Sequence, residues 1–283
     1  MNVGNEQPSA GSPRALKPHE LRELQKIELG ILLDVQATCE RLGLRFYLGE
    51  GTLLGAIRHN GFIPWDDDVD LLMPRADFDR FVSEAPRQLG ERYAVQHAST
   101  VPGFWSPLIK VRLIDKSTPF SQSNIAHLTD QNGPLVDIFP LDYVPKNHGL
   151  ALHLQSLWVR GFRSMLVLCL GVKPATTPLR RLSRLLGRIF GPSRLHRALA
   201  LGFTAHRHKG QLPYLANFGS YRPLPGQVLP RDVYGQPGTV TFENHLFPAP
   251  HQPLAVLAAN YGDYRTPIPP KDGTDAHEFV VRR

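Results

Sequence analysis

The sequence has few cysteines, no long apolar run and, over one long stretch, no acidic residues. Its two cysteines, Cys39 and Cys169, lie in unrelated contexts. This excludes a disulfide framework and a cysteine-rich zinc module, and it favours a reducing compartment. No uncharged apolar run reaches the roughly 18 residues that a membrane-spanning helix requires. The nearest candidate, 150–172, is interrupted by Arg160 and Arg163, so we expect no spanning helix.

The N-terminal segment lacks the apolar core of a secretory signal. Residues 1–17 are polar and contain Gly, Pro and Ser, so we expect them to be disordered and not to direct secretion. No internal repeat is present. Together with the low cysteine content, these features favour a cytoplasmic protein.

Asp and Glu are absent between Tyr143 and Arg231. These 89 residues hold 14 Lys and Arg, whereas the rest of the chain carries 18 basic and 25 acidic residues, so the net charge of +7 is the sum of +14 and −7. Solvated basic faces normally intersperse acidic residues. The block therefore favours an anionic membrane surface or an anionic glycan or lipid-linked acceptor, with a plain solvated face as the alternative. Nucleic acid is not expected, because no aromatic–basic interleaving or DNA-reading motif is present.

The periodicity of apolar residues predicts an α+β protein with a small mixed sheet. A helix is expected over 18–42, begun by Pro18 and stopped by Gly43. Further helices are expected over 77–89, 150–172 and 179–207, and strands over 44–48, 93–96, 107–114 and 135–139. The expected regions are a disordered 1–17, a catalytic core over 18–145, a basic helical region over 146–210 and a Pro/Gly-rich region over 211–283 that completes the substrate site.

The most informative segment is the acidic run Trp65-Asp66-Asp67-Asp68-Val69-Asp70. On a strand, Asp68 and Asp70 would share one face about 7 Å apart, Asp66 would join them, and Asp67 would point away. Carboxylates on one face repel unless a cation lies between them, and Mg²⁺ prefers oxygen ligands that it shares with phosphates. A solvated acidic turn is the alternative, but the apolar residues on both sides favour a metal site.

A calcium loop of the EF-hand type is excluded by spacing. That loop needs Gly at its sixth position and Glu at its twelfth. Counted from Asp66, these positions hold Leu71 and Asp77.

Upstream of the acidic run, a glycine turn precedes a helix. Gly49, Gly51 and Thr52 could bring backbone N–H groups close to a phosphate. A tight turn explains the same residues equally well, because they form neither a G-x-G-x-x-G motif nor a P-loop.

Charged residues on two later strands extend the candidate site. Asp137 is a lone carboxylate in an apolar strand, so it should face a metal or another cation. Asp142, beyond Pro140, is expected in a turn. Lys110 and Arg112 alternate on one strand, where phosphate binding and a solvated strand face are both open.

Two further pairs are candidates for substrate contact. Arg58 and His59 follow the first glycine turn and its helix, and a surface turn is an equal alternative. Tyr261 and Asp263 near the C-terminus could close over the substrate, with packing as the alternative.

The stretch YLGEGTLLGAIRHNGFIPWDDDVDLLM resembles the signature of the LicD family, which includes fukutin-type enzymes. The family belongs to the nucleotidyltransferase superfamily, whose pattern is a Gly-Ser/Thr pair, a helix, an Asp-x-Asp strand and a third acidic strand. Gly51-Thr52, Asp68 with Asp70, and Asp137 match these elements in order. Other blocks that resemble the family are Lys110-Val-Arg112 with Thr118, LVDIFPLDYVP, FENHLFPAP and NYGDYRTPIPPKDGTDAH, so the resemblance spans 18–277 and is weakest over 146–210.

This resemblance implies transfer of a phospho-alcohol, such as phosphocholine or ribitol phosphate, from a CDP-linked donor to a glycan such as lipopolysaccharide or teichoic acid. Mg²⁺ (or Mn²⁺) would be held by Asp68 and Asp70 with Asp137 and Asp66, and Asp137 could instead take the hydroxyl proton. The residues expected to bind donor phosphates are Gly49, Gly51, Thr52, Lys110 and Arg112.

Two other functions fit the same residues. One is a glycosyltransferase that uses an Asp-x-Asp metal site for a nucleotide-sugar. The other is a non-catalytic protein that binds anions or membranes through its basic block. Under the phosphotransferase hypothesis the protein is expected on the inner face of the membrane, in peripheral contact through residues 146–210.

Overall fold

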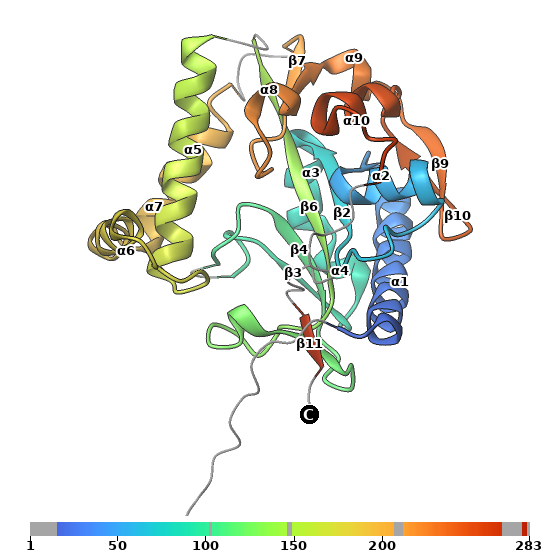
Figure 1. The fold of residues 1–283 in the computed structure, drawn as a ribbon, viewed down its shortest axis with the longest axis horizontal. Helices are drawn as coiled ribbons and strands as arrows, with labels where there is room; N and C mark the ends of the chain where they lie inside the picture. Colours follow the sequence, from blue (N-terminus) through green and yellow to red (C-terminus); the bar gives the residue numbers. More distant parts are fainter. Residues whose placement is uncertain (1–15, 102–103, 146–148, 207–211, 268–278, 282–283) are drawn as a thin grey trace, which may run out of the picture.

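The fold is organised around one mixed β-sheet (Figure 1). The computed structural model describes residues 16–101, 104–145, 149–206, 212–267 and 279–281. Within them a seven-stranded sheet has the order β1-β2-β6-β4-β3, and β7 and β8 continue it from β6. Its strands are β1 (Tyr47–Leu48), β2 (Asp70–Pro74), β3 (Tyr93–Gln96), β4 (Ile109–Leu113), β6 (Leu135–Val144), β7 (Tyr214–Ala216) and β8 (Val228–Pro230). The α+β class is confirmed.

Helix α1 (Pro18–Leu42) packs against the sheet with the predicted bounds. Pro18 opens it, and Gly43 closes it in the left-handed conformation with φ 62°. Its apolar face, including Ile31 and Val35, is buried in the main core. The predicted disorder over 1–17 falls largely outside the described residues, but Leu16 is described and is buried against α1.

Helix α2 (Glu50–His59) connects β1 to β2. It ends at Asn60 with φ 56°, and the chain then folds back closely. A Cβ on Gly55 would lie 2.4 Å from the carbonyl oxygen of Gly61, so only glycine allows this approach.

Two helices replace the single helix predicted over 77–89. Helix α3 (Arg75–Glu84) begins directly after Pro74, and α4 (Pro86–Leu89) begins at a second proline. Proline favours the first turn of a helix but donates no hydrogen bond inside one, which accounts for both boundaries.

Strand β6 is longer than the predicted 135–139, and it corrects the placement of Asp142. The strand continues to Val144 through Pro140. Its pairing with β4 ends at Ile138, and its pairing with β7 begins at Asp142, so the proline lies where β6 has no antiparallel neighbour. Asp142 is therefore a buried strand residue and not part of a turn.

The basic region forms three helices on the side of the sheet away from α1 (Figure 1). They are α5 (Leu150–Cys169), α6 (Pro178–Phe190) and α7 (Pro192–Phe203). The predicted helix 179–207 breaks between α6 and α7, where Gly191 takes φ 79° and a proline follows. No helix in the described part of the chain is long and apolar enough to cross a bilayer.

The C-terminal region adds short elements around the sheet. They are α8 (Leu224–Gln227), α9 (Arg231–Tyr234), the hairpin β9 (Gly238–Phe242) and β10 (His245–Ala249), and α10 (Pro253–Tyr261). A separate pair joins β11 (Phe279–Val281) to β5 (Phe120–Gln122), which the 3-10 helix η1 (Ser123–Ile125) follows.

Candidate active site

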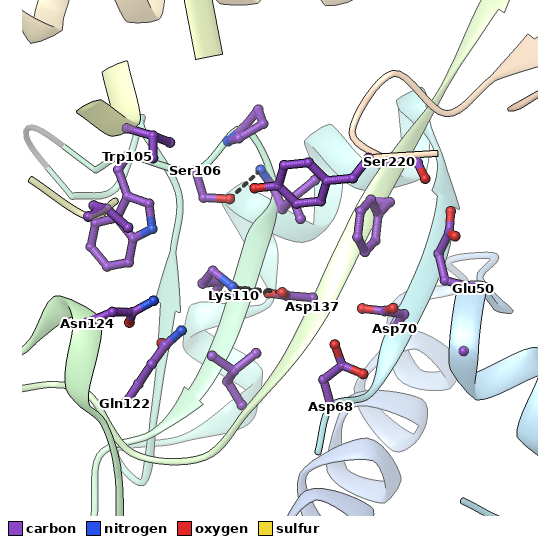
Figure 2. A pocket seen from close by; sticks show the side chains of 18 of the residues that line it. Glu50, Asp68, Asp70, Trp105, Ser106, Lys110, Gln122, Asn124, Asp137 and Ser220 are labelled. Atoms are coloured by element: carbon purple, nitrogen blue, oxygen red, sulfur yellow. Dashed lines mark hydrogen bonds and ion pairs between the residues drawn. The ribbon is translucent and has the colours of Figure 1, made fainter. Parts of the chain in front are cut away.

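Three neighbouring strands place charged residues at one level of the sheet. Strands β2 and β6 run parallel with Asp70 opposite Asp137, and the antiparallel β4 places Lys110 opposite Asp137. Lys110 Nζ donates to both carboxylate oxygens of Asp137, at 2.7 Å each (Figure 2). The cation that Asp137 was expected to face is therefore an ammonium group of the same protein.

The N-terminal end of α2 is fixed to the first residue of β2. The N–H of Asp70 donates to Thr52 Oγ1 at 2.8 Å, and the N–H of Gly49 donates to the carbonyl of Asp70 at 2.9 Å. Thr52 and Gly49 thus hold the strand in place, and neither lines the cavity described below. These contacts give them a structural role, and their expected contact with donor phosphate stays a prediction.

The acidic loop lies against the same helix end. A Cβ on Gly51 would lie 2.7 Å from Asp66 Oδ2, so the Asp66 side chain lies directly against the first turn of α2. On the other side, Gln25 Nε2 of α1 donates to the carbonyl of Asp66 at 2.9 Å. Residues before Asp70 are not strand, so the alternation of side chains expected for a strand does not apply to Asp67, which lines the cavity together with Asp66 and Asp68.

A cavity of about 470 Å³ opens over these residues, a size suited to a small-molecule ligand. One wall is acidic and consists of Glu50, Asp66, Asp67, Asp68, Asp70 and Asp137. Cations in the remaining wall are Lys110, Arg163, Lys173 and Arg222. In Figure 2 the side chains of Asp68, Asp70 and Glu50 gather on one side, and the Lys110–Asp137 pair lies beside them. The cavity therefore presents carboxylates and cations to a single ligand.

The carboxylates of Asp68 and Asp70 carry more negative charge than their surroundings balance. Burial raises the pKa of both well above its ordinary value, and neighbouring carboxylates raise it further. Asp137 and Glu50 act in this way on Asp70, whereas Lys110 opposes the rise. A group with such a pKa binds a proton or a cation more readily than an ordinary Asp.

Glu28 of α1 adds a further buried acid to this region. Its side chain is fully buried, and neither carboxylate oxygen has a hydrogen-bond partner. Burial raises its pKa well above the ordinary value, and Asp67 and Asp66 contribute to the rise. A buried carboxylate without a partner is costly unless a cation or proton compensates it.

The donor set fits a hard cation that shares its ligands with a substrate. Among the described residues no three His, Cys, Asp or Glu side chains already form a closed metal group. A closed zinc-type site would need such a group. Mg²⁺ commonly takes only one or two carboxylates from the protein, and it completes its shell with water and substrate phosphates. Asp68 and Asp70 could supply the two carboxylates.

Glu50 is a site residue that the sequence pattern did not single out. It lies in the first turn of α2 with φ 40° and lines the cavity. Asn217 Nδ2 donates to its Oε1 at 2.9 Å, and Arg222 Nε lies 3.1 Å from its Oε2. Burial raises the pKa of Glu50, and Arg222 opposes that rise.

Arg112 does not reach the cavity, which corrects its expected role. It is fully buried, and its guanidinium donates to Gln96 Oε1 at 3.0 Å and to Gln122 Oε1 at 2.8 Å. Gln122 lines the cavity. Arg112 therefore supports the wall from behind, whereas Lys110, two residues earlier, forms part of it.

Arg58 and His59 also lie away from the cavity. They form the last turn of α2, and Arg58 Nε donates to His59 Nε2 at 2.9 Å. The cavity contacts the opposite end of this 10-residue helix, about 15 Å away. Their expected role in substrate contact is not supported by this position.

Tyr261 and Asp263 are placed differently from each other. The ring of Tyr261 packs beneath Arg222, whose guanidinium carbon lies 3.8 Å from the ring centroid. Asp263 is exposed and accepts a hydrogen bond from Thr266 in a local turn. Neither lines the cavity, so Tyr261 acts through Arg222 and Asp263 has no contact with the site.

The acid-free block contributes to the cavity directly. Arg163 and Lys173 come from α5 and the loop after it, and Ser220, Tyr221 and Arg222 follow β7. The sequence marked this region by its lack of Asp and Glu. It did not show which of the 14 basic residues reach the cavity, because that depends on how α5 packs.

Comparison with known proteins agrees with this arrangement. Residues 43–165 match the family model described as LicD/FKTN/FKRP, nucleotidyltransferase domain. These residues include the whole acidic wall and Lys110, so the class of domain and the candidate site coincide.

Two relatives extend the match. The lipopolysaccharide cholinephosphotransferase LicD of Haemophilus influenzae is 30% identical over 275 residues, which cover 93% of this chain and 98% of that protein. The ribitol 5-phosphate transferase FKRP of Mus musculus is 47% identical over 51 residues, or 18% of this chain and 9% of that protein. The chain therefore belongs to the LicD family, and it is a phosphotransferase.

Proposed function

We propose that the protein transfers a phospho-alcohol, phosphocholine or a similar group, from a CDP-linked donor to a hydroxyl of a cell-surface glycan or glycolipid. The observation that carries this proposal is the pair Asp68 and Asp70, whose carboxyl groups have raised pKa values and line a cavity of ligand size together with four other acids. One relative is named a lipopolysaccharide cholinephosphotransferase and the other a ribitol 5-phosphate transferase, and these names support a phospho-alcohol as the transferred group.

Asp68 and Asp70 would hold Mg²⁺ or Mn²⁺ in this proposal, with Asp66 beside them. When bound, the metal would neutralise charge on the donor diphosphate and orient it. Asp137 lies at the level of Asp70 on the neighbouring strand. Its carboxylate could accept the proton of the attacking hydroxyl or join the metal ligands.

Lys110 would stabilise the departing nucleotide phosphate. Its ammonium group lines the cavity while bonded to Asp137. An ammonium has three donors, so it can bond to a phosphate oxygen without leaving its carboxylate. Preorganised cations of this kind stabilise the charge that develops in phosphoryl transfer.

A donor screen tests the proposed reaction. The protein is incubated with CDP-choline, CDP-ribitol and UDP-sugars in the presence of Mg²⁺, and released nucleotide is quantified. We expect CMP from a CDP-linked alcohol. Release of UDP alone would support the nucleotide-sugar glycosyltransferase and contradict the proposal.

We also propose that the protein works at an anionic membrane surface, which α6 contacts. This helix exposes six large apolar side chains, among them Leu179 at 73% and Ile189 at 66%. Its contact with α5 is made through Gly187, where a Cβ would lie 2.8 Å from Cys169 Cβ, so the apolar stripe faces away from the protein. Four arginines flank the stripe on a helix without acid. This combination is typical of helices that lie in the plane of an anionic membrane.

A further inference from the structure

A second cavity, of about 330 Å³, adjoins the first. Both are lined by Arg163, Val167, Lys173, Ser220 and Tyr221. Beyond these shared residues the second cavity is lined by Arg160, Ser164 and Leu168 of α5 and by Arg180 of α6. Its lining therefore contains four cations and no carboxylate, in contrast to the acidic wall of the first.

Arg163, at the junction of the two cavities, is a half-buried cation without a salt-bridge partner among the described residues. Its guanidinium donates to the carbonyl of Gly219, and its carbon lies 3.9 Å from the ring centroid of Tyr221. Burial lowers the pKa of Arg163. Tyr221 and Asp137 oppose this lowering without pairing with the guanidinium as a salt-bridge partner would, so an anionic ligand in the cavity would offset the remaining cost of desolvation.

The other cations that line the cavity have few contacts with the described residues. Arg160 Nη2 donates to the carbonyl of Arg222, and Arg180 Nη1 donates to Thr176 Oγ1 at 3.4 Å. Lys173 Nζ lies 4.7 Å from the ring centroid of Tyr221. Each arginine carries five N–H donors, so these contacts leave most of them available for the oxygens of a ligand.

We propose that this second cavity binds a phosphate group carried by the acceptor and thereby presents the acceptor hydroxyl to the carboxylate end of the first cavity. The inference rests on the proposed phosphotransfer. The donor diphosphate suits the acidic wall, where carboxylates can share a metal with it. The second cavity offers cations and two serines beside Val167, Leu168 and Tyr221, which suits a phosphate bound without metal next to the carbon frame of a sugar.

A charge-matched pair of double variants tests the subsite. Arg160→Gln with Arg180→Gln removes two cations that line only the second cavity. Arg181→Gln with Arg188→Gln removes two exposed cations of α6 that line neither cavity. Both proteins keep the residues of the first cavity, and circular dichroism and melting temperature verify that each variant folds.

Binding is measured by titration calorimetry with glucose 6-phosphate, with glucose as the neutral probe and CDP as the donor probe. We expect glucose 6-phosphate to bind wild type and the Arg181/Arg188 variant alike, and to bind the Arg160/Arg180 variant about tenfold more weakly or worse. Glucose should bind none of them measurably, and CDP should bind all three equally.

Two other outcomes overturn the assignment, and a third separates it from the proposed reaction. A parallel loss of CDP binding in the Arg160/Arg180 variant would make the second cavity part of the donor site. Unchanged glucose 6-phosphate binding, with loss of binding to vesicles that contain phosphatidylglycerol in the Arg160/Arg180 variant but not in the Arg181/Arg188 variant, would make it a lipid-headgroup site. Selective glucose 6-phosphate binding in a protein that releases no CMP from any donor would leave the phosphate site standing while the proposed reaction fails.

Discussion

Two buried aspartates on neighbouring strands should respond in opposite directions to the same substitution. Asp70 is 8% exposed, and burial together with the Asp137 and Glu50 carboxylates raises its pKa. Asp142 is 3% exposed, and its two oxygens accept from Arg75 Nε at 2.7 Å and Nη2 at 2.9 Å. We expect Asp70→Asn to stabilise the metal-free protein and Asp142→Asn to destabilise it.

The magnitudes follow from charge separation and burial. The charge on Asp70 is repelled by neighbouring carboxylates such as Asp137 and Glu50. Two like charges about 7 Å apart at an effective dielectric constant near 20 repel by about 2 kcal/mol, so Asp70→Asn should raise the free energy of unfolding by about that amount. Breaking a buried ion pair from one side costs about 3–5 kcal/mol, which sets the expected loss for Asp142→Asn. In a chain of this length these changes move the melting temperature by about 5 °C upward and about 10 °C downward.

The pH dependence of stability independently tests whether Asp70→Asn raises the free energy of unfolding. Because the pKa of Asp70 is raised in the folded state, the folded protein binds more protons, and wild-type stability falls as pH rises from about 3.9 toward that raised value. The gain from Asp70→Asn should therefore be present at neutral pH and disappear below about pH 4.

The assay is urea unfolding in EDTA at neutral pH and at pH 4, repeated with Mg²⁺. Mg²⁺ should stabilise wild type and leave Asp70→Asn unchanged. Equal destabilisation of both variants at neutral pH would refute the idea that Asp70 carries uncompensated charge, and would make it an ordinary paired core acid.

The remaining predictions concern Lys110 and α6. Lys110→Gln should lower transfer about 10²–10³-fold, because it removes a preorganised cation and leaves Asp137 unpaired; CMP release within tenfold of wild type would exclude the role given to Lys110. Leu182→Gln with Ile189→Gln should reduce sedimentation with vesicles that contain phosphatidylglycerol, whereas Leu254→Gln, an exposed leucine on α10, should not. If the α6 variant keeps vesicle binding but converts a wild-type dimer to a monomer by light scattering, the apolar stripe is a dimer contact and the membrane proposal is wrong.

Local signals were sufficient for helix α1 and for locating the acidic run, whereas the helices predicted over 77–89 and 179–207 each divide into two. Pro18 begins α1 and Gly43 ends it because proline favours the first turn of a helix and glycine adopts the left-handed conformation that closes one. Both preferences are local, so they can be read from the sequence. Asp70, Asp137 and Lys110 stand out as charged residues in apolar strands, and the sheet register places them at one level of the cavity, which Asp68 lines from the loop before β2.

Positions that depend on pairing were not predictable from the sequence. Pro140 suggested a strand end, yet β6 continues because its neighbours change from β4 to β7 at that point. Arg112 shares a strand face with Lys110, yet Gln122 lies between Arg112 and the cavity. Both outcomes are set by elements that are distant in sequence.

The residues that complete the site come from segments remote from the acidic run. Arg222 pairs with Glu50 across 172 residues of sequence, and Arg163 reaches the cavity from α5. The acid-free composition marked the region, but it could not distinguish arginines at the cavity from those exposed on α6.

Metal-dependent release of CMP by matched aspartate variants tests the central claim most directly. CDP-choline and CDP-ribitol are incubated with wild type, Asp68→Asn and Asp263→Asn, each with Mg²⁺ and each with EDTA. We predict CMP release by wild type and by Asp263→Asn with Mg²⁺ only, and a loss of at least about 10³-fold in Asp68→Asn. Full release by a folded Asp68→Asn protein, or equal release in EDTA, would contradict the account.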